Sequence, residues 1–155
     1  MGPLNVLLDS DPRLREVAKP VDAIDDQVIE LAHEMLRVMY AANGLGLAAP
    51  QVGYPLRLIV VDVSKGRNSP LIMANPEIVG AFGHELGREA CLSVPGRWGM
   101  VLRRRTITAT WLDLEGKPNR RGFHGLAARA IQHEVDHLEG ILYPDKAAKM
   151  ATIGG

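Results

Sequence analysis

The sequence predicts a mixed fold in which one helix lies near each end of the chain and strands lie between them. Apolar side chains recur at helical spacing over residues 25–42, and a second helical segment covers residues 123–138. Residues 56–63 and 101–114 are rich in Val, Ile, Leu and Thr, which favour strands. We therefore expect both helices and sheets in this molecule.

Local signals order these elements along the chain. Residues 4–22 hold two proline-interrupted segments and are expected to be extended or turning. The first helix is expected to begin after an N-cap Asp25 or Asp26 and to stop at Asn43-Gly44.

Shorter elements complete this assignment. Residues 71–73 and 76–79 are expected to form two strands separated by a proline, and residues 115–118 a turn. Gly140 stands where a left-handed residue would end the second helix.

Composition restricts the class of protein. A length of 155 residues suits one domain, so we expect a single domain over residues 1–155. Eighteen basic residues balance eighteen acidic residues, which argues against a nucleic-acid-binding protein. No run of about 18 apolar residues and no signal-peptide pattern is present, so we expect neither a membrane segment nor export. Cys91 is the only cysteine, which excludes an internal disulfide and favours a reducing compartment.

The strongest functional signal is H-E-V-D-H at residues 133–137. On a helix, His133 and His137 lie on one face and can bind one metal ion, while Glu134 can reach a water molecule on that ion. Metal ions lower the pKa of bound water from about 16 to roughly 7, and a carboxylate relays the proton. The motif indicates a metal-dependent hydrolase; the alternative is a polar helix face with two unrelated histidines.

A catalytic metal usually has three protein ligands and an open position, so two histidines are one ligand short. The candidates are a carboxylate and the thiol of Cys91. Position 143, where one class of peptidase carries a third histidine, is Tyr143, and no glutamate follows Glu139. Cys91 is therefore the best candidate, although a lone cysteine can also be a small buried apolar residue.

Small residues dominate the segment G-L-G-L-A-A-P-Q-V-G at 44–53, so its backbone can come close to another segment or to a ligand. It follows a helix and lacks the third glycine or the Lys-Ser/Thr of phosphate-binding loops. A tight connection and a ligand-facing loop are both compatible with this pattern. In the second case, the Gln51 amide is the expected donor.

Three short motifs occur in a specific order. They are G-L-G-L-A-A-P-Q at 44–51, E-A-C-L-S at 89–93 and Q-H-E-V-D-H at 132–137. In order and separation they resemble the signature motifs of the peptide deformylases, and the resemblance covers nearly the whole chain. It implies an α+β fold with small antiparallel β-sheets packed around a central C-terminal helix that carries H-E-x-x-H, plus an N-terminal helix. Ala90 stands where most family members have glycine.

The resemblance implies removal of the N-formyl group from the N-terminal formylmethionine of newly synthesised polypeptides, with release of formate. It implies one divalent metal ion, natively Fe²⁺, with Zn²⁺, Ni²⁺ or Co²⁺ as substitutes in purified protein. The implied ligands are Cys91, His133 and His137, and the implied acid/base is Glu134.

The same resemblance implies roles for Gln51 and Leu92, and the residues themselves suggest several others. The Gln51 amide and the Leu92 N–H would hold the formyl oxygen, since such donors are typically worth about 10²–10³ in rate. An extended peptide would pair with the backbone of Gly46. Glu89 is expected either to pair with Arg103 and steady the cysteine loop, or to form an ordinary surface ion pair with it. Candidates for the pocket of the methionine side chain are Leu45, Leu126 and Ala130, with Arg129 at its mouth; the alternative for each is packing in the core.

The implied setting is the bacterial cytoplasm, with an organelle matrix or stroma as the weaker alternative. The implied partners are N-formylmethionyl nascent peptides, and transient contact with the ribosome is left open; no nucleic acid and no membrane is expected. Two rival functions use the same helix. One is a zinc peptidase that cleaves internal peptide bonds, and the other is a non-catalytic member of the fold that senses a metal or a formylated peptide.

Overall fold

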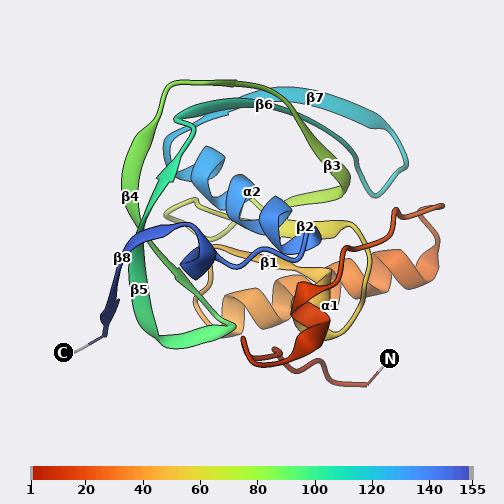
Figure 1. Cartoon of the computed structure of the whole chain (residues 1–155). Coiled ribbons are helices and arrows are strands. Elements are labelled where there is room, and N and C mark those ends of the chain that lie inside the picture. Colours follow the sequence, from red (N-terminus) through yellow and green to blue (C-terminus); the bar gives the residue numbers. More distant parts are fainter. Residues whose placement is uncertain (1, 154–155) are drawn as a thin grey trace.

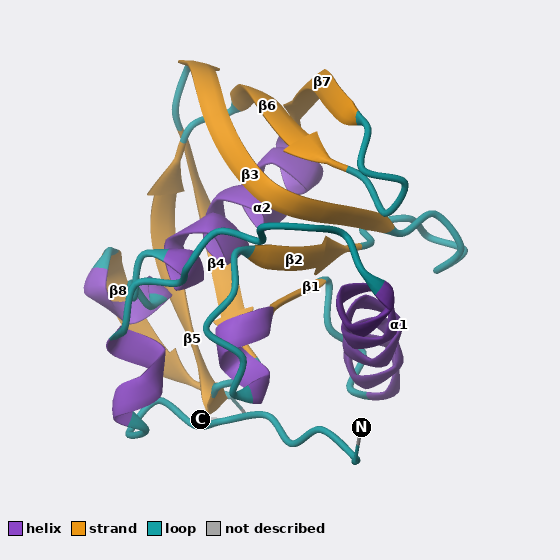
Figure 2. Cartoon of the chain, turned by 90° about the vertical axis from the view of Figure 1, so that its right-hand side faces the viewer, coloured by secondary structure: helices purple, strands orange, loops and turns teal. Residues whose placement is uncertain are grey.

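The computed structural model describes residues 2–153, which form two long helices, three short 3-10 helices and eight strands (Figures 1 and 2). Helix α1 spans Asp26–Ala41 and helix α2 spans Gly125–Leu138. The 3-10 helices are η1 (Pro12–Arg15), η2 (Ala49–Val52) and η3 (Tyr143–Asp145). The strands are β1 (Gly46–Ala48), β2 (Leu58–Val61), β3 (Leu71–Phe82), β4 (Glu85–Cys91), β5 (Val94–Arg103), β6 (Thr106–Leu112), β7 (Pro118–His124) and β8 (Ala147–Thr152).

All strand pairs within the two sheets are antiparallel. One sheet has five strands in the order β1-β2-β3-β6-β7, and the other has three in the order β4-β5-β8. Helix α2 runs through the middle of the molecule, with both sheets around it, while α1 lies outside, beside β1 and β2 (Figure 1). The predicted α+β class, with antiparallel sheets around a C-terminal helix, is confirmed.

Strand β2 lies between the two helices, which explains its uninterrupted apolar sequence. Successive side chains of a strand point to opposite faces. Ile59 and Val61 pack in the cluster that contains the apolar residues of α2, whereas Leu58 and Val60 pack in the cluster of α1. All four are buried, so β2 joins the two cores of the molecule.

The first helix follows its sequence signals closely. The Asp25 side chain accepts a hydrogen bond from the N–H of Val28, as an N-cap residue does. Buried residues of α1 recur on one face and pack on β1 and β2. No helix among the described residues is long and apolar enough to cross a membrane.

Two expected strand boundaries and one helix boundary are wrong. The expected strand 101–114 is interrupted at Arg104-Arg105, where the chain passes from β5 in one sheet to β6 in the other. The expected strands 71–73 and 76–79 are one strand, β3, because a bulge with left-handed Asn75 (φ 50°) accommodates the proline.

The second helix begins at Gly125 and not at residue 123. Phe123 and His124 pair with Ile107 and Thr106 at the end of β7, and this pairing holds them in the sheet. The expected loop 44–53 also contains the short strand β1 and the 3-10 helix η2.

Gly140 ends α2 with a left-handed backbone (φ 72°), and an added Cβ atom would lie 2.4 Å from the carbonyl oxygen of Arg15. We predict that Gly140→Ala lowers the free energy of unfolding by about 3 kcal/mol, because backbone strain and a clash add together. Gly116→Ala is the matched control, since Gly116 has φ 78° with no atom within 4 Å of the added carbon, and should cost about 1 kcal/mol. Urea denaturation of both variants checks the difference; equal losses would contradict the packing argument.

Candidate metal centre and active site

Helix α2 and the end of β4 bring three potential metal ligands together. His133 and His137 lie one helical turn apart, with ring centroids 5.1 Å from each other. Cys91 is the last residue of β4, and its Sγ atom lies 3.4 Å from Nε2 of His137. One ligand atom from each residue lies within 4.8 Å of the other two. A thiolate and two imidazoles are a donor set suited to Zn²⁺ or Fe²⁺.

The ring of His133 is oriented by its neighbours. Its Nδ1 atom lies 2.8 Å from Oε1 of Glu89, which leaves Nε2 as the nitrogen for a metal. The ring of Tyr143 stacks against it, with centroids 5.9 Å apart. The imidazole is thus held both at its edge and on its face.

Glu89 is buried and accepts hydrogen bonds from several cationic groups. Arg103 donates to both of its oxygens, at 2.8 Å each, and Arg129 donates to Oε2 at 2.7 Å. Arg103 also bonds Asp136 at 2.6 Å, so its guanidinium lies between two carboxylates. Burial raises the pKa of Glu89, but Arg103 and His133 outweigh it and lower the pKa to about 2. Glu89 is therefore ionised and holds His133, β5 and α2 together.

The two histidines have opposite pKa shifts. Burial lowers the pKa of His133, but the nearby Glu134 and the hydrogen bonds to Cys91 and Glu89 outweigh this and raise it well above its usual value. Burial and the charge of His133 lower the pKa of His137 well below its usual value. The Cys-His-His donor set itself fits a divalent metal ion.

Glu134 is almost fully buried beside these ligands. Its side chain packs against the backbone of Gly46, where an added Cβ atom would lie 2.6 Å from Oε2. Its Oε1 atom has no hydrogen-bond partner among residues 2–153. Burial raises the pKa of Glu134 to about 7 in the metal-free site. A carboxylate with such a pKa can both accept and release a proton near neutral pH.

The amide of Gln51 has a defined orientation. Its Oε1 atom accepts a hydrogen bond from the N–H of Ala48 at 3.0 Å, which identifies that atom as the oxygen. The Nε2 atom then donates toward Ser93 Oγ at 3.0 Å and lies 3.5 Å from Sγ of Cys91. The side chain is buried, so its NH₂ group is fixed beside the cysteine.

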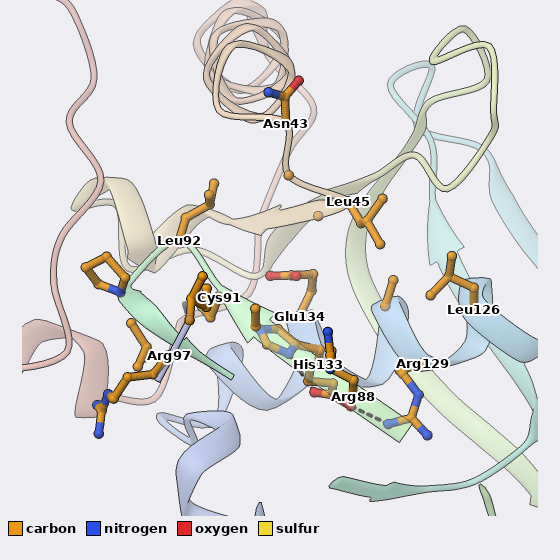
Figure 3. A pocket seen from close by; sticks show the side chains of 18 of the residues that line it. Asn43, Leu45, Arg88, Cys91, Leu92, Arg97, Leu126, Arg129, His133 and Glu134 are labelled. Carbon is orange, nitrogen blue, oxygen red and sulfur yellow. Dashed lines mark hydrogen bonds and ion pairs between the residues drawn. The ribbon is translucent and has the colours of Figure 1, made fainter. Parts of the chain in front are cut away.

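A pocket of about 410 Å³ opens above these groups. In Figure 3, Cys91, His133 and Glu134 lie below the segment that carries Leu45, while Leu126 and Arg129 project from α2. Most residues expected at the site line this pocket: Leu45, Gly46, Glu89, Cys91, Leu92, Leu126, Arg129, Ala130, His133 and Glu134. Gln51, His137 and Arg103 contact these residues from behind the pocket wall.

Arg129, which was expected at the pocket mouth, lines the pocket. It is buried, and its guanidinium donates to Glu89 and to the carbonyl oxygens of Val101 and Glu85. Only part of its side chain is therefore available to a ligand.

A family model described as polypeptide deformylase matches residues 3–152. The chain belongs to the peptide deformylase family. A peptide deformylase of Alkalilimnicola ehrlichii is 45% identical over 151 residues, which cover 97% of this chain and 85% of that protein. One of Nitrosococcus oceani is 47% identical over 145 residues, with coverage of 94% and 87%. The crystal structure of a peptide deformylase from Legionella pneumophila has a TM-score of 0.91 at 41% identity, covering 95% of this chain and 87% of that one.

Peptide deformylases are metal-dependent hydrolases that remove the N-formyl group from the N-terminal methionine of nascent polypeptides, and this chain is such an enzyme. The assignment excludes the rival functions of zinc peptidase and non-catalytic sensor.

Some residues around the site were not predicted from the sequence. Ser93 bonds Gln51, and Asp136 bonds Arg103, although both lie inside the motifs. Ile153 lines the pocket because β8 pairs with β5 and brings the end of the described chain to it. The sequence of β8 carries no strand signal of its own, so only the pairing could reveal Ile153.

Because the pKa of Glu89 is lowered from 4.5 to about 2, the unfolded chain binds more protons than the folded chain between these values. The stabilisation by Glu89 is thus complete above pH 4.5 and lost as the pH falls through about 2. We predict that Glu89→Gln costs about 3 kcal/mol in chelator-treated protein near neutral pH, and less on acidification.

Chemical denaturation as a function of pH checks this prediction. The control is Glu77→Gln on an exposed part of β3, which should change stability by less than about 0.5 kcal/mol. A Glu89→Gln deficit that stays constant from neutral to strongly acidic pH would contradict the ionised pairing.

Proposed function

We propose that Cys91, His133 and His137 hold one Fe²⁺ ion in this deformylase. The observation that carries the proposal is the convergence of their ligand atoms within 4.8 Å, on a helix and a strand far apart in sequence. The bound ion would supply an activated water and polarise the formyl carbonyl. The donor set itself suits Zn²⁺ equally, so the choice of iron rests on the family resemblance.

Glu134 is the proposed acid/base of the reaction. It accepts the proton of the attacking water and passes a proton to the leaving amine. Its burial next to the ligand cluster and its pKa of about 7 support this role, since both protonation states are accessible at neutral pH.

The Gln51 amide and the N–H of Leu92 are the proposed donors to the formyl oxygen. Neither group changes protonation, so both can stabilise developing negative charge without reorganisation. Support comes from the hydrogen bond between Ala48 and Gln51, which turns the NH₂ group of Gln51 toward Cys91. Leu92 follows Cys91 directly and lines the pocket.

The substrate peptide is proposed to pair with the outer edge of β1. This strand is the last in its sheet, so one edge has no neighbouring strand. The N–H of Asp62 donates to the carbonyl of Leu45, and the next pair is Gly46 opposite Val61. Hydrogen-bonded and non-hydrogen-bonded pairs alternate in antiparallel sheets, so the N–H and C=O of Gly46 point away from β2 and toward the pocket. An extended peptide can use such an edge as a further strand.

The proposed contacts of the methionine side chain are apolar. Leu45 and Leu126 are exposed at the pocket, and Ala130 also lines it. Exposed apolar side chains beside a cavity are typical of a binding site for an apolar group. The stem of Arg129 adds to this wall, while its guanidinium holds Glu89.

We further propose that the enzyme acts as one domain over residues 1–155 in the bacterial cytoplasm, where it contacts the ribosome transiently. The match to the family over residues 3–152 supports one domain, and the bacterial origin of the similar proteins supports the location. An organelle matrix or stroma is the weaker alternative.

The assigned roles predict a specific pattern of activity losses. Glu134→Ala should reduce formate release from a formyl-Met tripeptide at least about 10²-fold with metal still bound, because the acid/base is lost. Cys91→Ser should reduce activity through weaker metal retention. Formate release and metal content of anaerobically purified proteins distinguish the two. Glu115→Ala, in an exposed turn, is the control and should match the wild type. Equal activity in the wild type, Glu134→Ala and Cys91→Ser would contradict the mechanism.

The identity of the metal predicts the outcome of reconstitution. Chelation should abolish formate release, and one equivalent of Fe²⁺ per chain, added without oxygen, should restore it more fully than Zn²⁺. Kinetics and elemental analysis of each reconstituted protein measure this. Full recovery with Zn²⁺ and none with Fe²⁺ would contradict the assignment of iron.

A further inference from the structure

The loop after β2, residues 64–70, lies beside residues 43–46, which form one wall of the pocket. From this loop, the guanidinium of Arg67 donates hydrogen bonds to the carbonyl oxygens of Gly44 and Asp62, the latter at 2.6 Å. The same group lies over the ring of Tyr40, 5.1 Å from its centroid. Arg67 therefore joins the end of α1, the end of β2 and Gly44 in the pocket wall.

The loop that carries Arg67 is itself firmly held. The buried carboxylate of Asp62 accepts hydrogen bonds from Tyr40 Oη at 2.6 Å, from Ser64 Oγ at 2.6 Å and from the N–H groups of Ser64 and Ser69. Burial raises the pKa of Asp62, but the hydrogen bonds from Ser64 and Tyr40 outweigh it and lower the pKa to about 2. Asp62 is thus ionised, and Arg67 keeps a left-handed backbone (φ 53°) within this turn.

Support for the pocket wall matters at Gly44 and Gly46, where the backbone carries no side chain and packs closely against its neighbours. An added Cβ atom at Gly46 would lie 2.6 Å from Glu134, and one at Gly44 would lie 3.2 Å from the side chain of Leu92. Glycine also leaves the backbone conformationally free. A small displacement of this wall would therefore change the space above Glu134. It would also change the direction of the Gly46 N–H and C=O that point away from β2.

We propose that Arg67 is a positioning residue for substrate binding. By holding the Gly44 carbonyl against the Asp62 turn, it fixes the wall on which the formylated peptide pairs. This inference rests on the proposed pairing of the peptide with Gly46. Arg67 does not line the pocket and acts through Gly44, so it affects binding of the peptide more than the chemical step.

Arg67→Asn is the appropriate variant, because asparagine tolerates a left-handed backbone while the guanidinium is removed. We expect the KM for a formyl-Met tripeptide to rise about tenfold, as for loss of a hydrogen bond from a charged group. We expect kcat to stay within about threefold and the KM of N-formylmethionine, which has no peptide to pair, to change little. Arg67→Lys keeps one donor and should give an intermediate KM.

Arg104→Ala is the matched control. Arg104 likewise donates to two main-chain carbonyls, those of Ala81 and Gly83, and none of the three residues lines the pocket. The Tm of Arg104→Ala is expected to fall by about as much as that of Arg67→Asn, while the KM of Arg104→Ala stays unchanged. An equal rise of KM in Arg104→Ala would assign the effect to general destabilisation and overturn the inference.

The remaining outcomes separate this inference from the proposed function. If the wild type binds the tripeptide no better than N-formylmethionine, the pairing with Gly46 is wrong. If the wild type prefers the tripeptide and folded Arg67→Asn keeps that preference, the pairing with Gly46 stands and only the role of Arg67 is wrong. Should Arg67→Asn fail to fold, a wild-type KM in Arg67→Lys would likewise overturn the inference.

Discussion

The candidate metal centre depends on one buried carboxylate, that of Glu89. Its two oxygens accept hydrogen bonds from Arg103 on β5, Arg129 on α2 and the ring of His133. A buried carboxylate is costly unless its charge is paired and its lone pairs are satisfied, and here both conditions are met. Because Glu89 lies two residues before Cys91 on β4, the contact that orients His133 also determines where the strand carrying Cys91 lies. The same carboxylate thus couples the geometry of the ligand set to the docking of the smaller sheet on α2.

Close backbone approach is the second condition for this arrangement. Helix α2 carries long polar side chains in the interior of the protein, and these need space that the flanking strands provide at glycine. An added Cβ atom would lie 2.6 Å from Glu134 at Gly46 and 2.7 Å from Arg129 at Gly87. The small residues at 44–51 therefore have two proposed roles. They permit tight packing against α2, and they leave the edge of β1 open to the substrate peptide.

Much of the candidate site could be predicted because its residues occur in short motifs. The i, i+4 spacing of His133 and His137 follows from helical geometry alone. The role proposed for Cys91 needed elimination of other ligands and the family resemblance, because no local rule predicts which distant strand meets a helix. The boundaries that were wrong have the same cause. Phe123 is buried in β7 by pairing with Ile107, and the chain changes sheets at Arg104 although its sequence continues as a strand. The ladder partners, which lie far away in sequence, decide these local structures.

The polarity of α2 shows why the site requires both sheets. Arg129, Gln132, His133 and Glu134 are buried, although such residues in a helix usually face water. Gln132 illustrates how the surrounding strands replace water: its amide bonds both the N–H and the C=O of Arg104, at the point where the chain leaves one sheet for the other. That connection has no regular ladder partner, so the glutamine satisfies groups that the crossing would otherwise leave unpaired. A residue of the signature helix therefore stabilises the crossing between the sheets, and the crossing in turn allows β5 to place Arg103 against Glu89. The fold and the candidate metal centre are thus built from the same polar contacts.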